Sequence, residues 1–444
     1  MIGCSYGKFF QVTVAGGSYQ EALVAHIQGV PSGIYIEEKD IYFDLLQRKP
    51  GQGELSSPRR EPDIPVIATG VNCADTMPGF KNEGRTNGTP LTVLIPNLDR
   101  HFEHIDAYQR TNRTPRPGHA SYASYQKYGS FDDSIGAGIF SGRYTATIVA
   151  AGAVAKKILK DRGIELFSYV KEAAGVSMPE MDYDMVRDRV AAFKEFRAAH
   201  DPVYDLVYSQ GRIKPGMRML EKMAVLAEIE KMVPEIRREP FGESAVRELK
   251  LKGAHPVLNC PDPEAAQAMY DAIMKICGQG DSSGGIVEVV ARGVPAGIGE
   301  PVFDKLDGEL GRMMSIGTVK AVEVGAGMNV KDMTGSGCND QMFMKNGRVA
   351  FSGNNAGGIT GGLSTGQDIV VRLAVKPTPT IAKDQHTIDK VSLEDVTLSA
   401  ITRRDPTIVS RVWPVAEAFT AIVILDQYVS NLAYQEMRRI YDGR

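Results

Sequence analysis

The chain has 444 residues, of which 43% are hydrophobic and 24% charged, the proportions of an ordinary soluble globular protein. Its formal net charge of −3 excludes attraction of the whole protein to nucleic acid or to an anionic membrane, so any anion must be bound by local Arg and Lys clusters. The five cysteines are scattered without a CxxC pair, which argues against a disulfide framework and a structural zinc site and fits a reducing cytosol.

Short β-rich runs separated by Gly and Pro predict strands in the first 150 residues. These runs lie at residues 9–14, 66–70 and 91–95. The pattern changes at residues 145–160, where a series of small side chains suits a helix packed closely against a neighbour. Three lysines near the end of that segment favour a helix C-terminus there.

A helical insertion is predicted in the middle of the chain, within residues 165–250. Residues 177–250 are rich in Glu, Lys, Arg and Met, and apolar positions recur at helical spacing in 219–232. The insertion would cover the core or carry a subunit contact. A solvated surface hairpin is the alternative interpretation.

The remainder of the chain again mixes helix and strand signals. Residues 263–277 predict a helix, 286–290 a strand and 415–438 a closing helix. Between them, residues 325–381 are rich in glycine, which indicates positive φ angles or a close approach to something planar or anionic. No signal peptide is recognised, no apolar run approaches the ~20 residues of a membrane helix, and no low-complexity linker divides the chain. We therefore expect one compact α+β domain over residues 1–444.

The first candidate for chemistry is the segment Pro115-Arg116-Pro117-Gly118-His119. The prolines fix φ on both sides of the arginine, and the glycine allows the backbone to turn so that the imidazole can point into a cavity. An imidazole with a pKa near ~6.5 is a natural proton shuttle. A lone histidine is more often a structural residue, so both interpretations stay open for this segment alone.

Two further segments combine cations with hydrogen-bond donors. Ser141-Gly142-Arg143 directly precedes a predicted helix and is either an anion cradle or a simple N-cap. Arg403-Arg404-Asp405-Pro406 is followed by Arg411. It either holds a carboxylate in its ionised form between guanidinium groups or is a surface ion pair.

The glycine-rich run is the fourth candidate. It contains Gly357-Gly358 and is followed by Lys376-Pro377-Thr378-Pro379-Thr380. Small residues leave room for a flat ring system, and Lys376 and Thr380 could meet its phosphate or carbonyl oxygens. The run is neither a G-x-G-x-x-G turn after a strand nor a Walker loop, so the common nucleotide-binding folds are not indicated.

Together and in this order, the segments resemble the chorismate synthase family. That family reads GESHG, RRRPG, RPGHAD, GGRxSARET, GVPAGLGEPVFD, N-x-AGGI-x-GGIS-x-G, KPTxTI, and RHDP with a P-x-EA helix. The corresponding segments here are residues 16–20, 47–51, 116–121, 138–145, 293–304, 354–366, 376–381, and 403–406 with 414–418. The match spans nearly the whole chain, and only the region 165–250 looks expanded.

The resemblance implies a fold, an assembly and a reaction. The fold is a βαβ sandwich in a single domain, the assembly a cytoplasmic homotetramer, and the cofactor reduced FMN, with no metal. The reaction is that of a carbon–oxygen lyase of the shikimate pathway. It is a redox-neutral 1,4-anti elimination of phosphate from 5-enolpyruvylshikimate 3-phosphate, which gives chorismate or, through an altered pocket, an analogous cyclohexadiene.

The resemblance also assigns roles to individual residues. His119 would balance the proton at the N1/O2 side of the flavin, and Asp405 would relay the proton from N5. The substrate anions would be held by Ser18, Arg48, Lys49, Arg116, Ser141, Arg143 and Arg403. The flavin pocket would be lined by Ser141, Gly142, Arg143, Gly317, Thr318, Gly357, Gly358, Lys376, Thr380 and Asp405.

Departures from the family pattern cluster at the phosphate end of the expected site. Tyr19 stands where GESHG has a second catalytic histidine, and it remains a catalytic candidate as a hydrogen-bond donor, although a phenol is a poor cationic partner for phosphate. Lys49 replaces an arginine and loses its bidentate fork. Glu54 aligns with a further substrate-contacting arginine, with Arg59 and Arg60 close by.

These departures leave two alternative functions open. One is a paralogue that eliminates, dehydrates or isomerises a different, non-phosphorylated cyclohexene acid. The other is a non-catalytic flavin-binding scaffold. The retained pair of His119 and Asp405 speaks against the scaffold, which has no need of a proton relay.

Overall fold

The first of two sheets is built from the N-terminal part of the chain. The structure is a computed structural model that describes residues 3–57, 59–73, 82–99, 113–133, 135–236, 241–399 and 404–442. The sheet is antiparallel in the order β1-β2-β3-β5-β4. Its strands are Ser5–Tyr6 (β1), Gln11–Ala15 (β2), Ala22–Gln28 (β3), Val66–Thr69 (β4) and Leu91–Pro96 (β5). The three predicted strands are thus confirmed as β2, β4 and β5.

The second sheet is also antiparallel, in the order β7-β6-β8-β14-β9. Its strands are Glu165–Ala173 (β6), Val176–Ser177 (β7), Gly285–Arg292 (β8), Val319–Val324 (β9) and Ile369–Val375 (β14). The strand predicted at 286–290 is confirmed as β8. The helical region expected from residue 165 begins later, because residues 165–173 form a strand that pairs with β8, with one irregularity between Val170 and Glu172.

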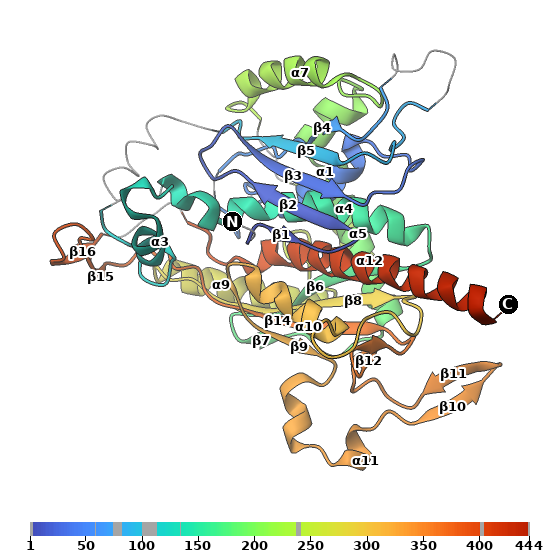
Figure 1. Ribbon diagram of the computed structural model, residues 1–444. Coiled ribbons are helices and arrows are strands. Elements are labelled where there is room, and N and C mark those ends of the chain that lie inside the picture. The colour runs from blue at the N-terminus through green and yellow to red at the C-terminus, as the bar shows by residue number, and fades with distance from the viewer. Residues whose placement is uncertain are drawn as a thin grey trace.

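A layer of helices separates the two sheets (Figure 1). It consists of Glu38–Arg48 (α1), Thr145–Lys160 (α4) and Val409–Asp442 (α12). Helix α4 packs against the first sheet, α12 packs against β6 and β8, and the two helices pack against each other. The molecule is therefore a sandwich of sheet, helices and sheet, as the family resemblance implied.

Helix α12 is longer than predicted. It begins at Val409 rather than at 415 and contains Pro414, which has no N–H to donate to the carbonyl of residue 410. By length and composition α12 could cross a membrane, but 89% of its apolar stretch is buried inside the protein. We therefore interpret it as the central core helix.

The helix layer also contains buried charges. Glu417 of α12 accepts hydrogen bonds from Lys156 of α4 at 2.6 Å and from Lys194 at 2.8 Å, and Lys156 also binds Asp44 of α1 at 2.7 Å. Burial alone would raise the pKa of Glu417, but the two ammonium groups outweigh it and lower that pKa to about 2. The network ties three central helices to the helix that contains Lys194.

The close approach of α4 and α12 depends on Gly152. A Cβ built on this glycine would lie 2.3 Å from the Cβ of Ala418, so the predicted tight packing of the small residues in 145–160 is confirmed. We expect Gly152→Ala to lower the free energy of unfolding by about 1–3 kcal/mol, because overpacking exceeds the gain in helix propensity. Chemical denaturation measures the change.

Gly278 provides the matched control for this prediction. It is the last residue of Pro263–Gly278 (α9), the helix predicted at 263–277, and a Cβ there would meet nothing within 4 Å. Gly278→Ala should leave stability unchanged or slightly raise it. Equal stability of the Gly152→Ala variant and the wild type would contradict the packing argument.

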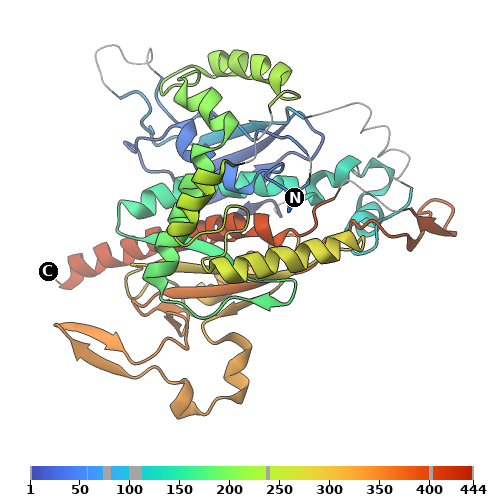
Figure 2. The ribbon, with the colours of Figure 1, turned by 180° about the vertical axis from the view of Figure 1, so that it is seen from behind.

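Helices of the middle region cover one side of the sandwich, the side that faces the viewer in Figure 2. Apolar residues of this region pack against α1 and β4 and form a second, smaller core. The region therefore covers the core, as the interpretation as a helical insertion predicted, and is not a solvated surface hairpin. Whether it is an insertion stays a prediction. The elements are Tyr183–Ala199 (α5), Pro202–Tyr204 (α6), Asp205–Ser209 (η4), Met219–Met232 (α7) and Glu243–Leu251 (α8).

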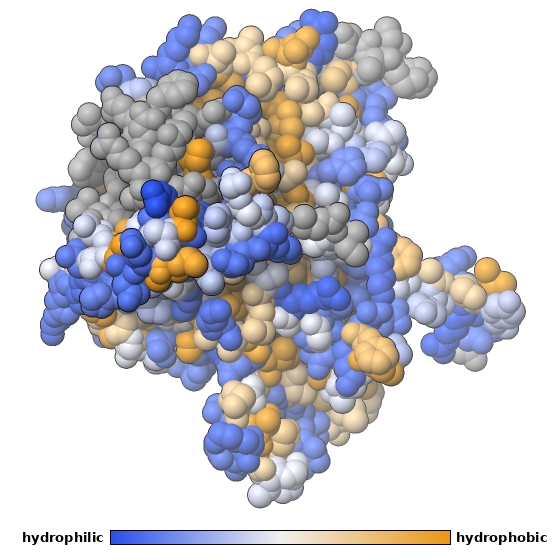
Figure 3. Space-filling view, turned by 60° about the vertical axis from the view of Figure 1, so that its left-hand side comes forward, coloured by the Kyte–Doolittle hydropathy of each residue, from blue (hydrophilic) through white to orange (hydrophobic). Residues whose placement is uncertain are grey.

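Shorter elements connect and decorate the sandwich. The hairpin β10–β11 projects away from the body (Figure 1), and polar residues dominate the face seen in Figure 3, with apolar residues in small groups between them. The elements are Ser121–Tyr128 (α3), Gly129–Phe131 (η1), Ile135–Phe140 (η2), Gly142–Tyr144 (η3), Leu306–Gly311 (α10), Arg312–Ser315 (η5), Gly327–Asp332 (η6), Gly335–Cys338 (α11), Met342–Lys345 (β10), Arg348–Phe351 (β11), Ile359–Thr360 (β12), Leu363–Ser364 (β13), Gln385–Ile388 (β15) and Asp395–Leu398 (β16).

Candidate active site

The segment 116–119 lies against the loop 376–380, which follows β14. Lys376 Nζ donates a hydrogen bond to the carbonyl of Gly118 at 2.5 Å, and Arg116 Nη1 donates to Thr380 Oγ1 at 3.3 Å. Gly118 has a φ of +72°, and a Cβ there would lie 3.4 Å from the Cβ of Pro379. Glycine therefore permits both the turn and the close approach of the two loops.

His119 is half-buried beside these cations. Burial lowers the pKa of its imidazole to about 4, with help from Arg116 and Lys376 and against a hydrogen bond to the backbone of Phe140. The ring is therefore neutral at physiological pH. Its Nδ1 is buried and has no hydrogen-bond partner among the described residues, so this nitrogen is available to a ligand.

Asp405 also contacts the loop 376–380. Its Oδ1 accepts hydrogen bonds from the backbone N–H of Ser57 at 2.7 Å and from Arg411 Nη1 at 3.0 Å, and its carbonyl accepts one from Thr378 Oγ1 at 3.0 Å. The side chain is only 19% exposed, so this pair is not the surface ion pair offered as an alternative. One loop thus contacts the backbone of Gly118, next to His119, and the backbone of Asp405.

Arg404, the next residue towards the N-terminus, does not join this contact. Both terminal nitrogens of Arg404 donate to carbonyl oxygens at the C-terminal end of α9, those of Gly280 at 3.0 Å and Cys277 at 2.9 Å. A cation at a helix C-terminus stabilises it, so Arg404 is structural here. Arg403 lies outside the residues that the structure describes.

Ser141 acts as an N-cap, as the simpler interpretation predicted. Its Oγ accepts a hydrogen bond from the N–H of Arg143 at 3.2 Å and starts η3. The same turn lies next to the site, because His119 bonds to the backbone of the preceding Phe140. Capping does not prevent a ligand role, since Gly142 remains exposed and a Cβ there would meet nothing within 4 Å.

Gly317 and Thr318 meet the same region from the start of β9. The N–H of Gly317 donates to Tyr144 Oη at 3.2 Å, and the carbonyl of Thr318 accepts from the N–H of Lys376 at 2.9 Å. Gly317 also has open space where a Cβ would stand. The expected lining residues from 141–143, 317–318 and 376–380 therefore converge.

Three cations expected to hold the substrate are instead paired with buried carboxylates. Arg48 and Arg143, 1% and 5% exposed, both bind Asp63, with Arg48 Nη2 at 2.5 Å from Oδ2. Lys49 binds Asp201, at the start of α6, at 2.5 Å. This differs from the expected substrate contact, because burial demands that each charge be compensated inside the protein.

The segment with Tyr19 is held by an arginine that the motifs did not assign. Arg59 Nη1 donates to Ser18 Oγ and Nη2 to the Ser18 carbonyl, each at 3.1 Å, and its guanidinium lies 5.2 Å from the centre of the Tyr19 ring. Ser18 is buried and Tyr19 partly exposed. The sequence signal was only proximity, since Arg59 follows Glu54 in the same loop.

Two predicted positions lie apart from this cluster. Gly357 and Gly358 pack at the end of β9 opposite to Lys376, and that strand spans roughly 17 Å from Val319 to Val324. A Cβ on Gly357 would lie 2.3 Å from the nitrogen of Gly325. Their positive φ angles therefore serve a backbone contact within this chain, and they do not meet the loop 376–380.

Glu54 also points elsewhere. Its carboxylate accepts a hydrogen bond from Tyr270 of α9, so the side chain of Glu54 points towards α9.

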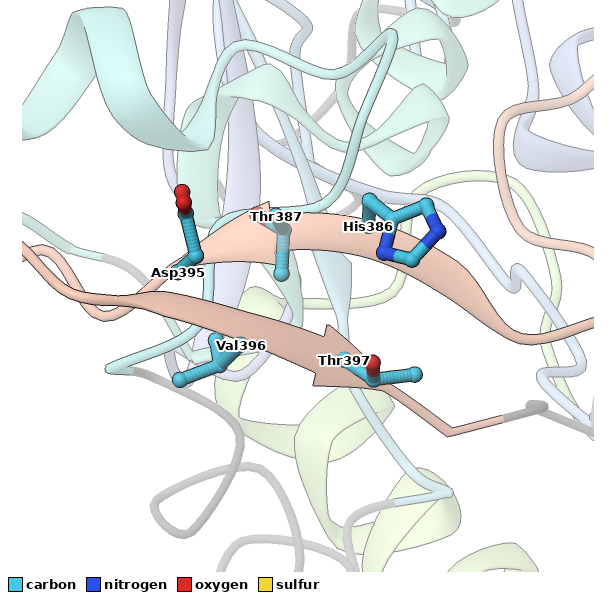
Figure 4. Close-up of a pocket in the computed structure, with 5 residues that line it drawn as sticks. All are labelled: His386, Thr387, Asp395, Val396 and Thr397. Atoms are coloured by element: carbon cyan, nitrogen blue, oxygen red, sulfur yellow. The ribbon is translucent and has the colours of Figure 1, made fainter.

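A surface hollow of about 370 Å³ lies on the hairpin β15–β16 and contains none of the predicted site residues. It is lined by His386, Thr387, Asp395, Val396 and Thr397 (Figure 4). The imidazole of His386 and the carboxylate of Asp395 lie at opposite ends of the hollow and do not converge. Thr387 Oγ1 donates to the carbonyl of Pro115 at 2.6 Å, so the hairpin braces the segment 116–119 from outside.

The fold and the site define an α+β protein of the sheet–helix–sheet type, with a neutral histidine and an aspartate joined by one loop. A sequence model of the family "Chorismate synthase" matches residues 10–429. Chorismate synthase of Acetivibrio thermocellus is 36% identical, over 100% of this chain and 99% of that protein, and that of Methanosarcina mazei is 36% identical over 97% of each. This chain belongs to the chorismate synthase family.

A solved structure agrees on the fold. A crystal structure of chorismate synthase covers 99% of this chain and 98% of its own, with a TM-score of 0.58 and 23% sequence identity. The resemblance identified from the motifs and the expected sandwich fold are both confirmed.

Proposed function

We propose that the protein is a carbon–oxygen lyase that eliminates phosphate from 5-enolpyruvylshikimate 3-phosphate and forms chorismate. One observation carries the proposal. The loop 376–380 contacts the backbone of Gly118, next to His119, through Lys376 and the backbone carbonyl of Asp405 through Thr378, which supports proton-transfer roles for His119 and Asp405 at a common site. Membership of the family supports the same reaction.

The residues present fit reduced FMN. His119 Nδ1 and Thr318 Oγ1 are buried without a hydrogen-bond partner among the described residues, and open space lies in front of Gly142 and Gly317. When bound, reduced FMN supplies electron density that assists cleavage of the C–O bond. The residues that would hold it are those of 141–143, 317–318 and 376–380.

The chain's own groups then have separate tasks. Neutral His119 accepts or shares a proton at Nδ1. The carboxylate of Asp405, held by Ser57 and Arg411, accepts a proton from the substrate side. Ser18 and Tyr19 offer hydroxyl donors to an anionic oxygen. We further propose that the enzyme works as a cytoplasmic homotetramer, as its family resemblance implies.

One observation favours a second candidate, a paralogue with a non-phosphorylated substrate. Arg48 and Arg143 already share Asp63, and Lys49 is already paired with Asp201, whereas a phosphate dianion needs charge-assisted donors. The two candidates differ in whether phosphate is released.

An anaerobic assay decides between them. With 5-enolpyruvylshikimate 3-phosphate and chemically reduced FMN, we expect a rise in diene absorbance and an equal amount of inorganic phosphate. The control omits the reductant and should form no product. Absence of both products with intact, flavin-binding protein would refute chorismate synthesis and favour the paralogue.

A further inference from the structure

Arg59 makes several contacts with the segment that contains Ser18 and Tyr19. It comes from the loop between α1 and β4 and binds the Ser18 hydroxyl and carbonyl, as described above. Its Nη2 also donates to Glu61 Oε1 at 2.8 Å. The guanidinium also lies over the ring of Tyr19. These contacts hold Arg59 against Ser18 and Tyr19, and Tyr19 is the residue that stands where the family's GESHG motif has its histidine.

The opposite side of that segment is equally constrained. The backbone turn 136–138 lies against it, because the N–H of Ser18 donates to the carbonyl of Gly138 at 3.3 Å and a Cβ on Gly136 would lie 2.4 Å from the Tyr19 ring. Ala137 in this turn has a φ of +73°. A non-glycine residue in this region is strained, and such strain is concentrated at functional sites.

The arginines beside this segment differ in exposure. Arg48, Arg59 and Arg143 are in direct contact with two carboxylates, those of Glu61 and Asp63. Two further carboxylates lie near the segment, because Asp99 acts on Arg59 and Asp133 accepts a hydrogen bond from Gln20. The side chains of Arg48 and Arg143 are 2% and 3% exposed, whereas that of Arg59 is 17% exposed. Of these three cations, Arg59 is therefore the one most accessible to a ligand.

We propose that Arg59 holds Tyr19 and Ser18 in place and supplies the positive charge with which they recognise a phosphate monoester. The inference rests on the proposed function. The cradle consists of one guanidinium and two hydroxyl donors, and this set suits the oxygens of a dianion. This cradle would bind the anion in place of two family residues. The family's histidine is Tyr19 here, and the lysine that replaces a family arginine, Lys49, is paired with Asp201.

The test compares Arg59→Lys and Arg59→Ala with Arg60→Lys. Arg60 is the matched control because its side chain donates to the carbonyl of Pro234 at 2.6 Å and not to Ser18. Binding of 5-enolpyruvylshikimate 3-phosphate is measured by calorimetry with oxidised FMN, so that no turnover occurs. Inorganic phosphate is titrated separately, and kcat and KM are measured with reduced FMN.

We expect Arg59→Lys to raise Kd and KM by about tenfold, because the lysine keeps the charge but loses the fork, and Arg59→Ala to raise them further. The rate constant kcat should fall less than KM rises, a split that general loosening of the fold would not produce. Inorganic phosphate should bind the wild type and Arg60→Lys alike and bind Arg59→Ala more weakly.

The outcomes separate the inference from the proposed function. If the wild type converts the substrate but the Arg59 variants keep its Kd within twofold, the inference is wrong and the function stands. If the wild type does not convert it, the function is wrong, and the phosphate titration still decides the inference. Equal phosphate affinity of the wild type and Arg59→Lys overturns the inference. Because Arg59→Lys keeps a cation beside Glu61, this result does not depend on how well Arg59→Ala folds.

Discussion

His119→Ala is expected to lower turnover by about 10²- to 10⁴-fold, the usual contribution of a positioned acid or base, while the protein stays folded. The histidine is only half-buried, and the segment around it is held by the hydrogen bond from the Lys376 ammonium to the Gly118 carbonyl and by the one from the Arg116 guanidinium to the Thr380 hydroxyl. Its removal should therefore take away the proton-accepting nitrogen without dismantling the loops.

The anaerobic assay measures this loss, with His386→Ala as the matched control. His386 is exposed on β15 and lines only the outer hollow, so its variant should keep wild-type turnover. An unchanged melting temperature must accompany the loss in His119→Ala. Full activity of this variant would contradict the assigned proton role.

The lowered pKa of His119 adds a pH test. Because the imidazole of the free enzyme has a pKa of about 4, it is neutral above that value and becomes cationic only as the pH falls towards 4. We therefore expect no break in kcat/KM near pH 6.5, where an unperturbed histidine titrates. A break near pH 6.5 that disappears in His119→Ala would show that the imidazole of the free enzyme titrates at its ordinary pKa and would contradict the lowered value.

Sequence reasoning could predict the loops of the site because their signals are local. The prolines and glycine of 115–118 dictate a turn, and the serine before α4 is a recognisable N-cap. Small residues in 145–160 foretold the approach of α4 to α12, since only a glycine such as Gly152 fits against Ala418. Matching segments in family order then determined the sandwich.

Partners distant in sequence could not be predicted in the same way. Lys49 is bound by Asp201, 152 positions further along the chain, and nothing near either residue indicates that α6 will pack there. Gly357 and Gly358 do have positive φ angles, as the sequence predicted. A positive φ, however, is equally compatible with contact to a flavin and with contact to a neighbouring backbone segment. Arg59 was near the expected site in sequence, and only its contact with Ser18 assigns it a task.

Asp63→Asn is expected to cost about 3–5 kcal/mol of stability at pH 7, because it leaves Arg48 and Arg143 buried without their shared counter-charge. The backbone does not confuse this test. Asp63 has a φ of +55°, and asparagine is among the residues that tolerate this conformation best. Asp161→Asn, at the exposed C-terminal end of α4, is the control and should change stability little.

The same carboxylate makes stability depend on acid pH. Burial would raise the pKa of Asp63, but Arg143 and Arg48 outweigh it and lower that pKa to about 2, from 3.8 in the unfolded chain. A lowered pKa means that the stabilisation is complete above pH 3.8 and is lost as the pH falls towards 2. Urea unfolding at several pH values should therefore show the wild type approaching Asp63→Asn in acid. A constant difference in stability between the two proteins across this range would contradict the view that ionised Asp63 compensates Arg48 and Arg143. It would also remove the reason for expecting Arg59, and not these two arginines, to bind the ligand.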